Sequence, residues 1–327
     1  MTVLVTGSAG HLGEALMRSL RAAGRPALGL DIKGSPFTDR VGSICDRRFV
    51  RQMMKGVRAV MHAASLHKPH VATHTGQDFI DTNVTGTLIL LEEAAAAGIE
   101  SFVFTSTTSA FGSALTPAAG EPAAWVTENV VPVPKNIYGV TKVAAESLCE
   151  LFFRRHRLPV IVLRTSRFFP EADDDPVIRN GYSTDNAQAN EMLNRRIDIE
   201  DVVSAHLVAI DKAAAIGFRR YIISATTPFS RNDLPALQRN APDVVARLFC
   251  DCKALFASRK WVLFPHIDRV YVNHLATAEL GWRPKYDFRH VLDCLRTGEE
   301  FRSPMAREVG SKGYHDAVFE LGPYPVA

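Results

Sequence analysis

A short apolar strand runs directly into a glycine-rich turn near the beginning of the sequence. The run at residues 3–6 leads into the pattern Gly-x-x-Gly-x-x-Gly, and a helix is predicted over about residues 11 to 23. In such a turn the first glycine permits a tight bend, the second lets the backbone approach a pyrophosphate, and the third lets the helix pack closely on its strand. The helix then directs its free N–H groups and positive dipole end at the phosphates. The turn predicts a dinucleotide site whose contacts include Gly7, Gly10, His11, Leu12 and Gly13.

An acidic residue at the end of the second predicted strand bears on which dinucleotide is bound. This strand covers residues 26–31, and Asp31 closes it at about the distance downstream where a carboxylate meets the adenosine ribose hydroxyls. Asp31 favours NAD, because the 2′-phosphate of NADP would face a like charge. Lys33 keeps NADP open as the less favoured alternative. The competing interpretation is that Asp31 simply ends a strand.

The composition is that of an ordinary soluble globular chain. The 327 residues, 46% hydrophobic and 22% charged, suffice for one large α/β domain with an appended lobe or for two modest domains. The formal net charge is only +3 and the arginine doublets are dispersed, so we expect no nucleic-acid partner. No apolar stretch is long enough to span a bilayer and no leader precedes the first strand. We therefore expect a cytoplasmic protein with no membrane partner.

The cysteines fit this compartment. There are five, an odd and scattered set without metal-ligand spacing, as expected of reduced thiols in a cytosolic chain. Cys250 and Cys252 are too closely spaced for the usual structural zinc knuckle, and the sequence assigns them no role.

Apolar strand-like runs alternate with helical patterns through the first half of the chain. Strands are predicted at residues 59–62, 101–105 and 159–164, and helices near 76–98 and 138–156. Such alternation is typical of a parallel sheet with helices on both faces. The sequence thus predicts an α/β fold with a doubly wound parallel-sheet Rossmann domain.

After residue 164 the pattern loosens into loops rich in proline and aspartate. A helix near 200–214 and a strand at 220–224 are expected to rejoin the sheet. The Rossmann domain is therefore assigned to residues 1–166 plus about 197–226, and a smaller mixed α/β substrate lobe to residues 167–196 plus about 227–327. This lobe would close over the crevice at the carboxyl ends of the strands, where ligands of such sheets bind.

A tyrosine and a lysine four residues apart begin one of the predicted helices. Tyr138 and Lys142 project from one face, and a nearby ammonium lowers the pKa of a phenol, which makes it a usable base towards a substrate hydroxyl. A pair on the helix surface is the alternative. The hydroxyl-rich run at residues 105–109, just beyond the fourth predicted strand, favours the catalytic interpretation, although such a run can also cap a strand end.

With these motifs the sequence resembles the extended short-chain dehydrogenase/reductase family, in particular its NAD-dependent sugar epimerase/dehydratase group. The resemblance covers roughly the first 225 residues, with the motifs in the same order. It rests on the glycine turn, Asp31, Asp46, His62-Ala63-Ala64-Ser65, Asn83-Val84-Thr85-Gly86-Thr87, the hydroxyl run, Tyr138-x-x-x-Lys142 and Leu163-Arg164.

The resemblance implies roles around the cofactor. Asp46 would contact the adenine region. Ala63 and Ala64 would lie along the cofactor, and Asn83 would brace the catalytic neighbourhood. Many relatives pair two helices into a four-helix dimer interface, so the helices near 76–98 and 138–156 are candidates for a homodimer contact.

The resemblance also implies the catalytic roles. Thr107 matches the family's Ser/Thr position, Tyr138 the base, and Lys142 the residue that binds the nicotinamide ribose and tunes the tyrosine. Dehydratases of this group usually carry an acidic pair directly after the catalytic threonine, whereas Thr108 and Ser109 stand here, so dehydration is not expected. Thr107 and Thr108 are expected to contact the substrate.

Other departures concern the substrate side. An insertion-like segment at 114–125 ends in Trp125, which is expected to cover the substrate cleft. Where relatives have an asparagine near the substrate pyrophosphate, this chain has Arg167, which either forks onto a phosphate or carboxylate or holds the acidic loop at 173–175. Arg195 and Arg196 match the family's basic position, with a similar choice between anion clamp and helix-end packing.

Four histidines, His62, His67, His70 and His74, follow the third predicted strand. Their spacing matches no compact ligand set and the proposed chemistry needs no metal, so no metal site is expected. Lys68 and His70 are expected to reach the substrate, because this loop borders the cleft in the family.

The leading hypothesis is an NAD-dependent epimerase-type oxidoreductase that acts on a sugar or nucleotide-sugar through a transient keto intermediate. The alternative is a net NAD(P)-dependent dehydrogenase or reductase of a sugar, sugar acid or other small carbonyl compound. A non-catalytic NAD-binding regulator is the third hypothesis, and the complete Thr107, Tyr138 and Lys142 set argues against it. The sequence does not identify the substrate.

Overall fold

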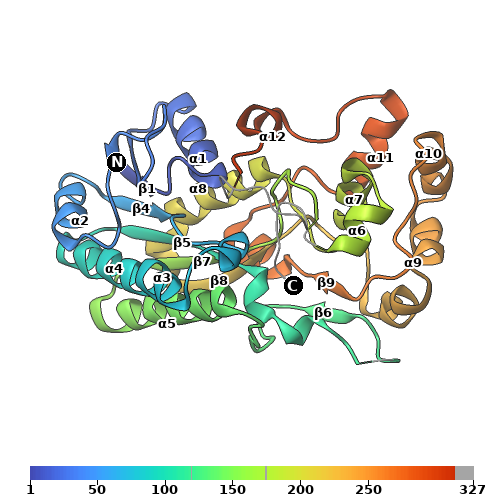
Figure 1. The fold of residues 1–327 in the computed structure, drawn as a ribbon, viewed down its shortest axis with the longest axis horizontal. Helices are drawn as coiled ribbons and strands as arrows, with labels where there is room; N and C mark the ends of the chain where they lie inside the picture. Colours follow the sequence, from blue (N-terminus) through green and yellow to red (C-terminus); the bar gives the residue numbers. More distant parts are fainter. Residues whose placement is uncertain (119, 174, 314–327) are drawn as a thin grey trace.

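Seven parallel strands form the centre of the molecule. The computed structural model describes residues 1–118, 120–173 and 175–313. The strand order is β3-β2-β1-β4-β5-β7-β8, and each neighbouring pair is parallel (Figure 1). From β1 the chain first adds β2 and β3 on one side of the sheet, and then returns to add β4 and the later strands on the other side. A crevice opens between β1 and β4, at the carboxyl ends of the strands. The predicted doubly wound α/β fold is confirmed. The strands are β1 (Val3–Thr6), β2 (Ala27–Asp31), β3 (Arg40–Val41), β4 (Ala59–His62), β5 (Ser101–Thr107), β7 (Val160–Thr165) and β8 (Phe218–Ile223).

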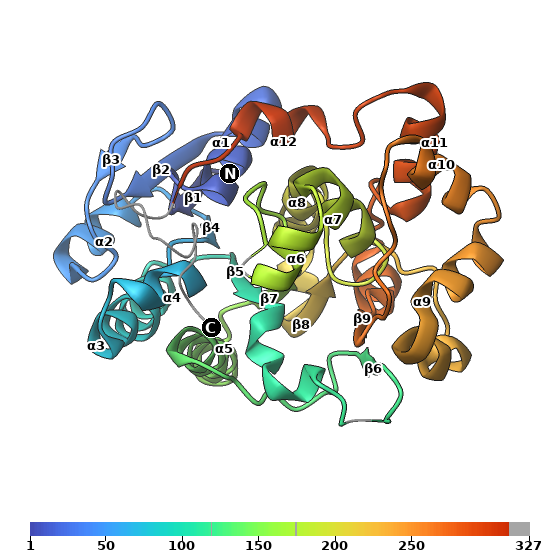
Figure 2. The same cartoon turned by 45° about the vertical axis from the view of Figure 1, so that its right-hand side comes forward.

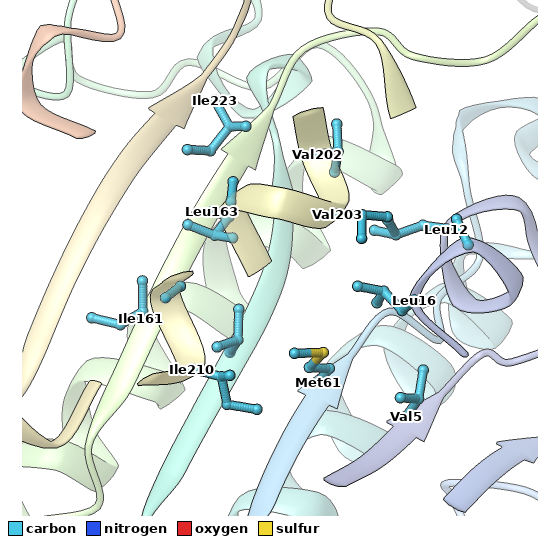
Figure 3. Packing of buried hydrophobic residues seen from close by; sticks show 14 of the residues in the cluster. Val5, Leu12, Leu16, Met61, Ile161, Leu163, Val202, Val203, Ile210 and Ile223 are labelled. Carbon is cyan, nitrogen blue, oxygen red and sulfur yellow. The ribbon is translucent and has the colours of Figure 1, made fainter. Parts of the chain in front are cut away.

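Helices cover both faces of this sheet. Their bounds are α1 (His11–Ala22), α2 (Arg47–Met53), α4 (Gly86–Ala96), α5 (Ile137–His156) and α8 (Ile199–Ile216). Side chains alternate across each strand, so Val5 packs under α1 and α8 whereas Leu4 packs under α2, α4 and α5. Figure 3 shows the first of these two cores, with Leu16 of α1 and Val203 of α8 facing Met61 of β4. Burial on both faces explains why the strands are almost continuously apolar.

The segment predicted as one helix near 76–98 is helical but interrupted. It consists of α3 (Gly76–Phe79), a π-helical turn η2 (Ile80–Thr85) and α4. The Thr87 hydroxyl, in the first turn of α4, donates to the Asn83 carbonyl oxygen of the π-helical turn over 2.7 Å. Such π-helical turns are frequent at functional sites, and this one places Asn83 towards the interior, where it is 2% exposed.

A second hydrophobic cluster lies beyond the carboxyl ends of the strands. It is built by short helices around a two-stranded parallel sheet of β6 (Ala124–Val126) and β9 (Arg269–Tyr271) (Figure 2). The predicted domain division stays a prediction, and Asp174 and residues 314–327 of the predicted lobe lie outside the described residues. The remaining elements are η1 (Lys68–Ala72), η3 (Thr108–Phe111), η4 (Ser113–Leu115), α6 (Pro176–Gly181), α7 (Thr184–Glu191), η5 (Arg231–Asp233), α9 (Leu234–Leu248), α10 (Cys252–Ser258), η6 (Ala276–Leu280), α11 (Phe288–Thr297) and α12 (Pro304–Val309).

Two expectations about the fold are corrected. The short edge strand β3 was not predicted, so the strand at the hydroxyl run is the fifth along the chain and not the fourth, and the run at 105–109 begins within that strand, which extends to Thr107. Trp125 does not cover the crevice: it belongs to β6, packs against the second hydrophobic cluster, and lies 5.5 Å under the Arg231 guanidinium. Burial of its apolar ring in a core explains this position.

None of the helices in the described part of the chain is long and apolar enough to cross a membrane.

The contact between α1 and the glycine turn leads to a stability prediction. A Cβ on residue 13 would lie 1.9 Å from the Gly7 carbonyl oxygen, so Gly13→Ala forces the backbone apart. We expect a loss of about 1–3 kcal/mol in the free energy of unfolding, measured by urea denaturation. Gly34→Ala is the matched control, because a Cβ there meets nothing within 4 Å. Equal effects of the two substitutions would contradict the close packing.

Candidate active site

A cavity of about 480 Å³ opens at the carboxyl ends of β1, β2, β4, β5 and β7. Its walls come from the glycine turn, the loop after β4, the hydroxyl run, the first turn of α5 and the loop after β7. Segments far apart in the sequence, including β9 and the residues after α12, complete it. The position is the one at which open α/β sheets bind their ligands.

The glycine turn forms one end of the cavity. Gly7, Gly10, His11, Leu12 and Gly13 all line it. Gly7 has φ +76°, and a Cβ there would lie 2.7 Å from the Ala64 nitrogen, so only glycine fits between the turn and the loop after β4. Gly10 donates its N–H to the Gly7 carbonyl oxygen over 3.0 Å, which closes the turn. Main-chain atoms and the N-terminus of α1 therefore face the cavity, as in a phosphate-binding turn.

The structure brings one of the two predicted acidic residues to the cavity. Asp31 lines it, and its carboxylate accepts the N–H groups of Ala9 (3.0 Å) and Lys33 (2.9 Å). Asp46, by contrast, lies outside: it is exposed and caps α2 by accepting the Phe49 N–H over 3.1 Å. Aspartate is a preferred residue at a helix N-cap, because its carboxylate accepts a free N–H group of the first turn, and this accounts for an aspartate at position 46.

The two alanines after β4 also differ in their placement. Ala63 lines the cavity, whereas Ala64 packs under the glycine turn and against the core below α4 and α5. Asn83 lies behind this loop and bridges it to α5. Its Oδ1 accepts the Leu66 N–H over 2.8 Å, and its Nδ2 donates to the Leu66 carbonyl oxygen (3.0 Å) and to Thr141 Oγ1 (3.1 Å). Asn83 thus fixes one wall of the cavity to the helix that carries the tyrosine.

Thr107, Tyr138 and Lys142 lie together at the other end of the cavity. The Asn136 side chain caps α5 by accepting the Gly139 N–H over 3.0 Å, which begins the helix just before Tyr138. Tyr138 is buried and its hydroxyl is hydrogen-bonded with Thr107. Burial raises the pKa of Tyr138 above its ordinary value, and the hydrogen bond with Thr107 only partly opposes this.

The expected lowering of the Tyr138 pKa by Lys142 is not found in this geometry. The ammonium donates to the Thr105 carbonyl oxygen over 2.6 Å and lies 4.2 Å over the Phe104 ring. Burial lowers the pKa of Lys142 to about 8, and the negative charge of Glu146 opposes this. The phenol therefore stays protonated here, because its own burial outweighs any effect of an ammonium that is directed at a carbonyl.

A buried ion pair anchors α5 to the sheet. The Glu146 carboxylate accepts from Arg164 Nε (3.0 Å) and Nη2 (2.7 Å), from the Ser106 hydroxyl (2.5 Å) and from Arg220 Nε (3.2 Å). Arg164 and Glu146 are 3% and 1% exposed. Arg164, one of the motif residues, is therefore structural: it fixes the helix that carries Tyr138.

The loop after β4 brings several cationic and imidazole groups to the cavity. Lys68, His70 and His67 line it, and Thr108 lines it from the hydroxyl run. His67 was not predicted as a site residue. Its ring lies 4.8 Å from the Tyr138 ring and 4.7 Å from the Phe169 ring, and burial holds its pKa well below the ordinary value, so it is neutral. The sequence shows a cluster of histidines after the third predicted strand, but only the folded structure shows that His67 is the one whose ring lies against Tyr138.

The other histidines of the cluster have separate surroundings. His62 lies in the core between the Thr6 hydroxyl (2.8 Å) and the Thr87 hydroxyl (3.0 Å), and burial lowers its pKa to about 3. Among the residues that the structure describes, no three His, Cys, Asp or Glu side chains are placed to hold a metal ion.

Arg167 and Arg195 line the cavity and also bond to the loop that follows β7. Arg167 lines the cavity, and its Nη2 donates to the carbonyl oxygens of Glu171 (3.1 Å) and Ala172 (2.8 Å). Arg195 also lines the cavity and pairs with Asp173 (2.8 Å) and Glu191 (2.7 Å).

Arg196 is buried and packs at the helix end. It pairs with the Glu191 carboxylate over 2.7 Å and also donates to the Phe169 carbonyl oxygen. Burial raises the pKa of Glu191, but the charges of Arg195 and Arg196 outweigh it and hold the pKa well below its ordinary value. The ion pairs thus tie the acidic loop to the end of α7.

Three residues that line the cavity were not predicted, because they come from segments with no recognisable motif. They are Arg269, Tyr271 and Lys312.

A model of the NAD dependent epimerase/dehydratase family matches residues 3–223. The chain belongs to this family, and the resemblance to the extended short-chain dehydrogenase/reductases is confirmed. It is 25% identical over 279 residues to UDP-glucose 4-epimerase of Erwinia amylovora, a match that covers 70% of this chain and 80% of the relative. Over 305 residues it is 26% identical to dTDP-D-glucose 4,6-dehydratase of Mus musculus, covering 87% and 78%. A third relative, an uncharacterized protein of Sinorhizobium fredii, is 34% identical over 169 residues, which are 50% of this chain and 40% of that protein.

Solved structures share the fold. A short-chain dehydrogenase/reductase superfamily protein from Agrobacterium tumefaciens with bound NAD superposes with a TM-score of 0.64 at 22% identity, covering 94% of this chain and 99% of that one. MoeE5 in complex with UDP-glucuronic acid and NAD gives a TM-score of 0.65 at 21% identity, with the same coverage. Both carry NAD.

The bridge made by Asn83 can be tested without a substrate. Asn83→Asp keeps the shape but replaces the amide donor by an acceptor, so the Leu66 carbonyl oxygen and Thr141 Oγ1 lose their donor. We expect a loss of about 1–3 kcal/mol in the free energy of unfolding at neutral pH, measured by urea denaturation. Asp81→Asn, an exposed position on the same π-helical turn, is the control and should change little. Unchanged stability of Asn83→Asp would refute the bridging role.

Proposed function

We propose that this protein is an NAD-dependent epimerase that acts on a sugar or nucleotide-sugar through a transient keto intermediate. The observation that carries the proposal is the single cavity that joins the glycine turn and Asp31 to Thr107, Tyr138 and Lys142. One end presents backbone N–H groups suited to phosphates, and the other presents a phenol, a hydroxyl and an ammonium. Family membership supports the same conclusion.

The residues present fit a bound dinucleotide. At Gly7 and Gly13 an added Cβ would collide with backbone, so the turn leaves the helix N-terminus open towards the cavity. The Asp31 carboxylate is held by two main-chain N–H groups and lines the cavity beside Ile32 and Lys33. A carboxylate at this position accepts ribose hydroxyls and repels a 2′-phosphate, which favours NAD over NADP. Bound NAD supplies the acceptor and donor of hydride.

The side chains at the other end would handle the substrate proton. Tyr138 is the proposed base towards the substrate hydroxyl, and Thr107 holds the same oxygen. Burial of Tyr138 excludes water but raises its pKa, so a positive charge is needed to offset it. Lys142, one helical turn further along α5, would supply this charge once its ammonium leaves the Thr105 carbonyl oxygen. The phenol would then return the proton to the same substrate oxygen when the keto intermediate is reduced.

The cavity lining favours epimerisation over dehydration. Elimination of water requires an acid to protonate the departing hydroxyl and a base to remove a proton. Thr108 and Ser109 stand directly after Thr107, and among the described lining residues Asp31, at the far end, is the only carboxylate. Although one relative is a dehydratase, the described residues that line the tyrosine end include no acidic group that such a reaction would use.

Tyr138→Phe tests the proposed base. Removing the hydroxyl should lower turnover by about 100- to 10,000-fold while NAD affinity changes little. Activity is measured with a panel of free sugars, uronates and nucleoside-diphosphate sugars, following product stereochemistry by NMR and NADH by absorbance. Tyr182→Phe, at a tyrosine outside the cavity lining, is the control. Unchanged turnover in Tyr138→Phe would refute the assignment, and stoichiometric accumulation of NADH would favour the net dehydrogenase.

We also propose a homodimer formed by η2, α4 and α5. These helices pack side by side (Figure 1), and they leave Ile80 36% and Val140 47% exposed on the outer surface. Val140→Glu should shift the protein to monomer at micromolar concentration in analytical ultracentrifugation, because it places a charge in the apolar contact. Val177→Glu, at a 75% exposed position on α6, should not. A wild-type monomer, or equal behaviour of both variants, would contradict the proposed contact.

A further inference from the structure

A segment from the far end of the described chain reaches the glycine-turn end of the cavity. Ser303 anchors its beginning: the Ser303 hydroxyl donates to Asp198 over 2.6 Å, its N–H donates to the same carboxylate over 3.0 Å, and its oxygen caps α12. α12 then packs against α1 and α8, as Figures 1 and 2 show. Residues 311–313 follow, here called the C-terminal segment, and Lys312 and Gly313 line the cavity.

The C-terminal segment is bonded to the first turn of α1. The Lys312 N–H donates to His11 Nε2 over 3.0 Å, and the Lys312 ammonium lies 2.6 Å from Glu14 Oε2. His11 lines the cavity within the glycine turn, and both partners belong to the helix whose N-terminus faces the cavity. These contacts locate Lys312 at the phosphate end and not at the tyrosine end.

A residue of the loop after β7 completes the contact. The Glu171 carboxylate lies 3.0 Å from His11 Nε2 and accepts the Ser311 hydroxyl over 2.7 Å. Burial raises the pKa of Glu171, but its contact with His11 and the hydrogen bond of Ser311 outweigh this effect, so the pKa of Glu171 lies below its ordinary value. Three separate parts of the chain therefore meet over the glycine turn.

Lys312 lies beside the N-terminus of α1 and forms an ion pair there with Glu14. Glu14, which is 5% exposed, lies 2.6 Å from the Lys312 ammonium and 2.9 Å from Arg18. Arg18 also pairs with Glu308 over 3.4 Å, whereas the Lys312 ammonium pairs with Glu14 and lines the cavity. An ammonium and a helix N-terminus together attract a phosphate more strongly than either alone. Neither the glycine motif nor the family model, which ends at residue 223, includes this lysine.

We propose that Lys312 is a cofactor-binding residue, whose ammonium contacts the diphosphate of the bound dinucleotide while the C-terminal segment closes that end of the cavity. The inference rests on the proposed function only in that the cavity must bind a dinucleotide. It assigns a phosphate contact to the end of the chain, in addition to the backbone N–H groups of the turn. Dissociation of the dinucleotide then requires the Lys312 contacts to His11 and Glu14 to open.

Equilibrium binding measurements with matched probes test this assignment. NAD, ADP-ribose and adenosine are titrated by calorimetry into the wild-type chain, Lys312→Gln and Lys312→Glu. ADP-ribose keeps the diphosphate without the nicotinamide, and adenosine lacks the diphosphate. We expect Lys312→Gln to weaken NAD and ADP-ribose about tenfold and Lys312→Glu more, with adenosine unchanged. Lys253→Gln, an exposed lysine in α10, should leave all three affinities unchanged.

Dissociation kinetics provide a second readout. Displacement of bound NADH, followed by its fluorescence in a stopped-flow instrument, should be faster in Lys312→Gln and in Ser311→Ala than in the wild type. Equal NAD affinity and release in the wild type and Lys312→Gln would overturn the inference, and so would an equal loss for adenosine, which would indicate a structural role. If the wild-type chain binds none of the three probes, the proposed function fails, a result that is distinct from both.

Discussion

The start of α1 approaches the end of β1 with no side chain between them, and the cavity depends on this contact. A Cβ on Gly13 would lie 1.9 Å from the Gly7 oxygen, and a Cβ on Gly7 would lie 2.7 Å from the Ala64 nitrogen. The turn is thus held between a helix on one side and the loop after β4 on the other. Main-chain N–H groups face the cavity as a result, and one neighbouring N–H, that of Ala9, binds Asp31 of the next strand. The close packing of the glycine turn therefore places both the N-terminus of α1 and the Asp31 carboxylate at this end of the cavity.

The tyrosine end depends on a different kind of interaction. Glu146 is buried with Arg164, and a buried carboxylate is tolerated only when its oxygens are fully occupied, as they are here by Arg164, Ser106 and Arg220. Such a pair contributes little net stability, but either partner left alone costs about 3–5 kcal/mol. Its effect is to fix α5 against β5 and β7 at one position. Tyr138 and Lys142, two turns and one turn earlier in α5, take their places from it.

The sequence predicted those strands and helices that have a recognisable local pattern of apolar residues. The segment at 59–62 is a short apolar run and the segment near 138–156 has a long helical pattern, and β4 and α5 have those bounds to within a residue. β3 is an exposed two-residue strand with no periodicity, and it was missed. Burial is a property of the folded chain, so the sequence could not show that it would raise the pKa of Tyr138 while Lys142 turned to a carbonyl. Trp125 was assigned to the cleft for the same reason, since its partners Arg231 and Val270 lie more than a hundred residues further along the chain.

The contact between the C-terminal segment and α1 also bears on the kind of reaction that the cavity suits. A net dehydrogenase releases its reduced cofactor in every cycle, so any contact that must open before the dinucleotide leaves slows turnover. A redox-neutral epimerase returns the hydride to its substrate and has no need to exchange the cofactor. Under the proposed closure, the bonds that join Lys312 to His11 and Glu14, and Ser311 to Glu171, would restrict an exchange that an epimerase does without. The two ends of the cavity thus bear on different alternatives: the described lining of the tyrosine end, which holds no carboxylate, argues against dehydration, and the contacts of the C-terminal segment argue against net dehydrogenation.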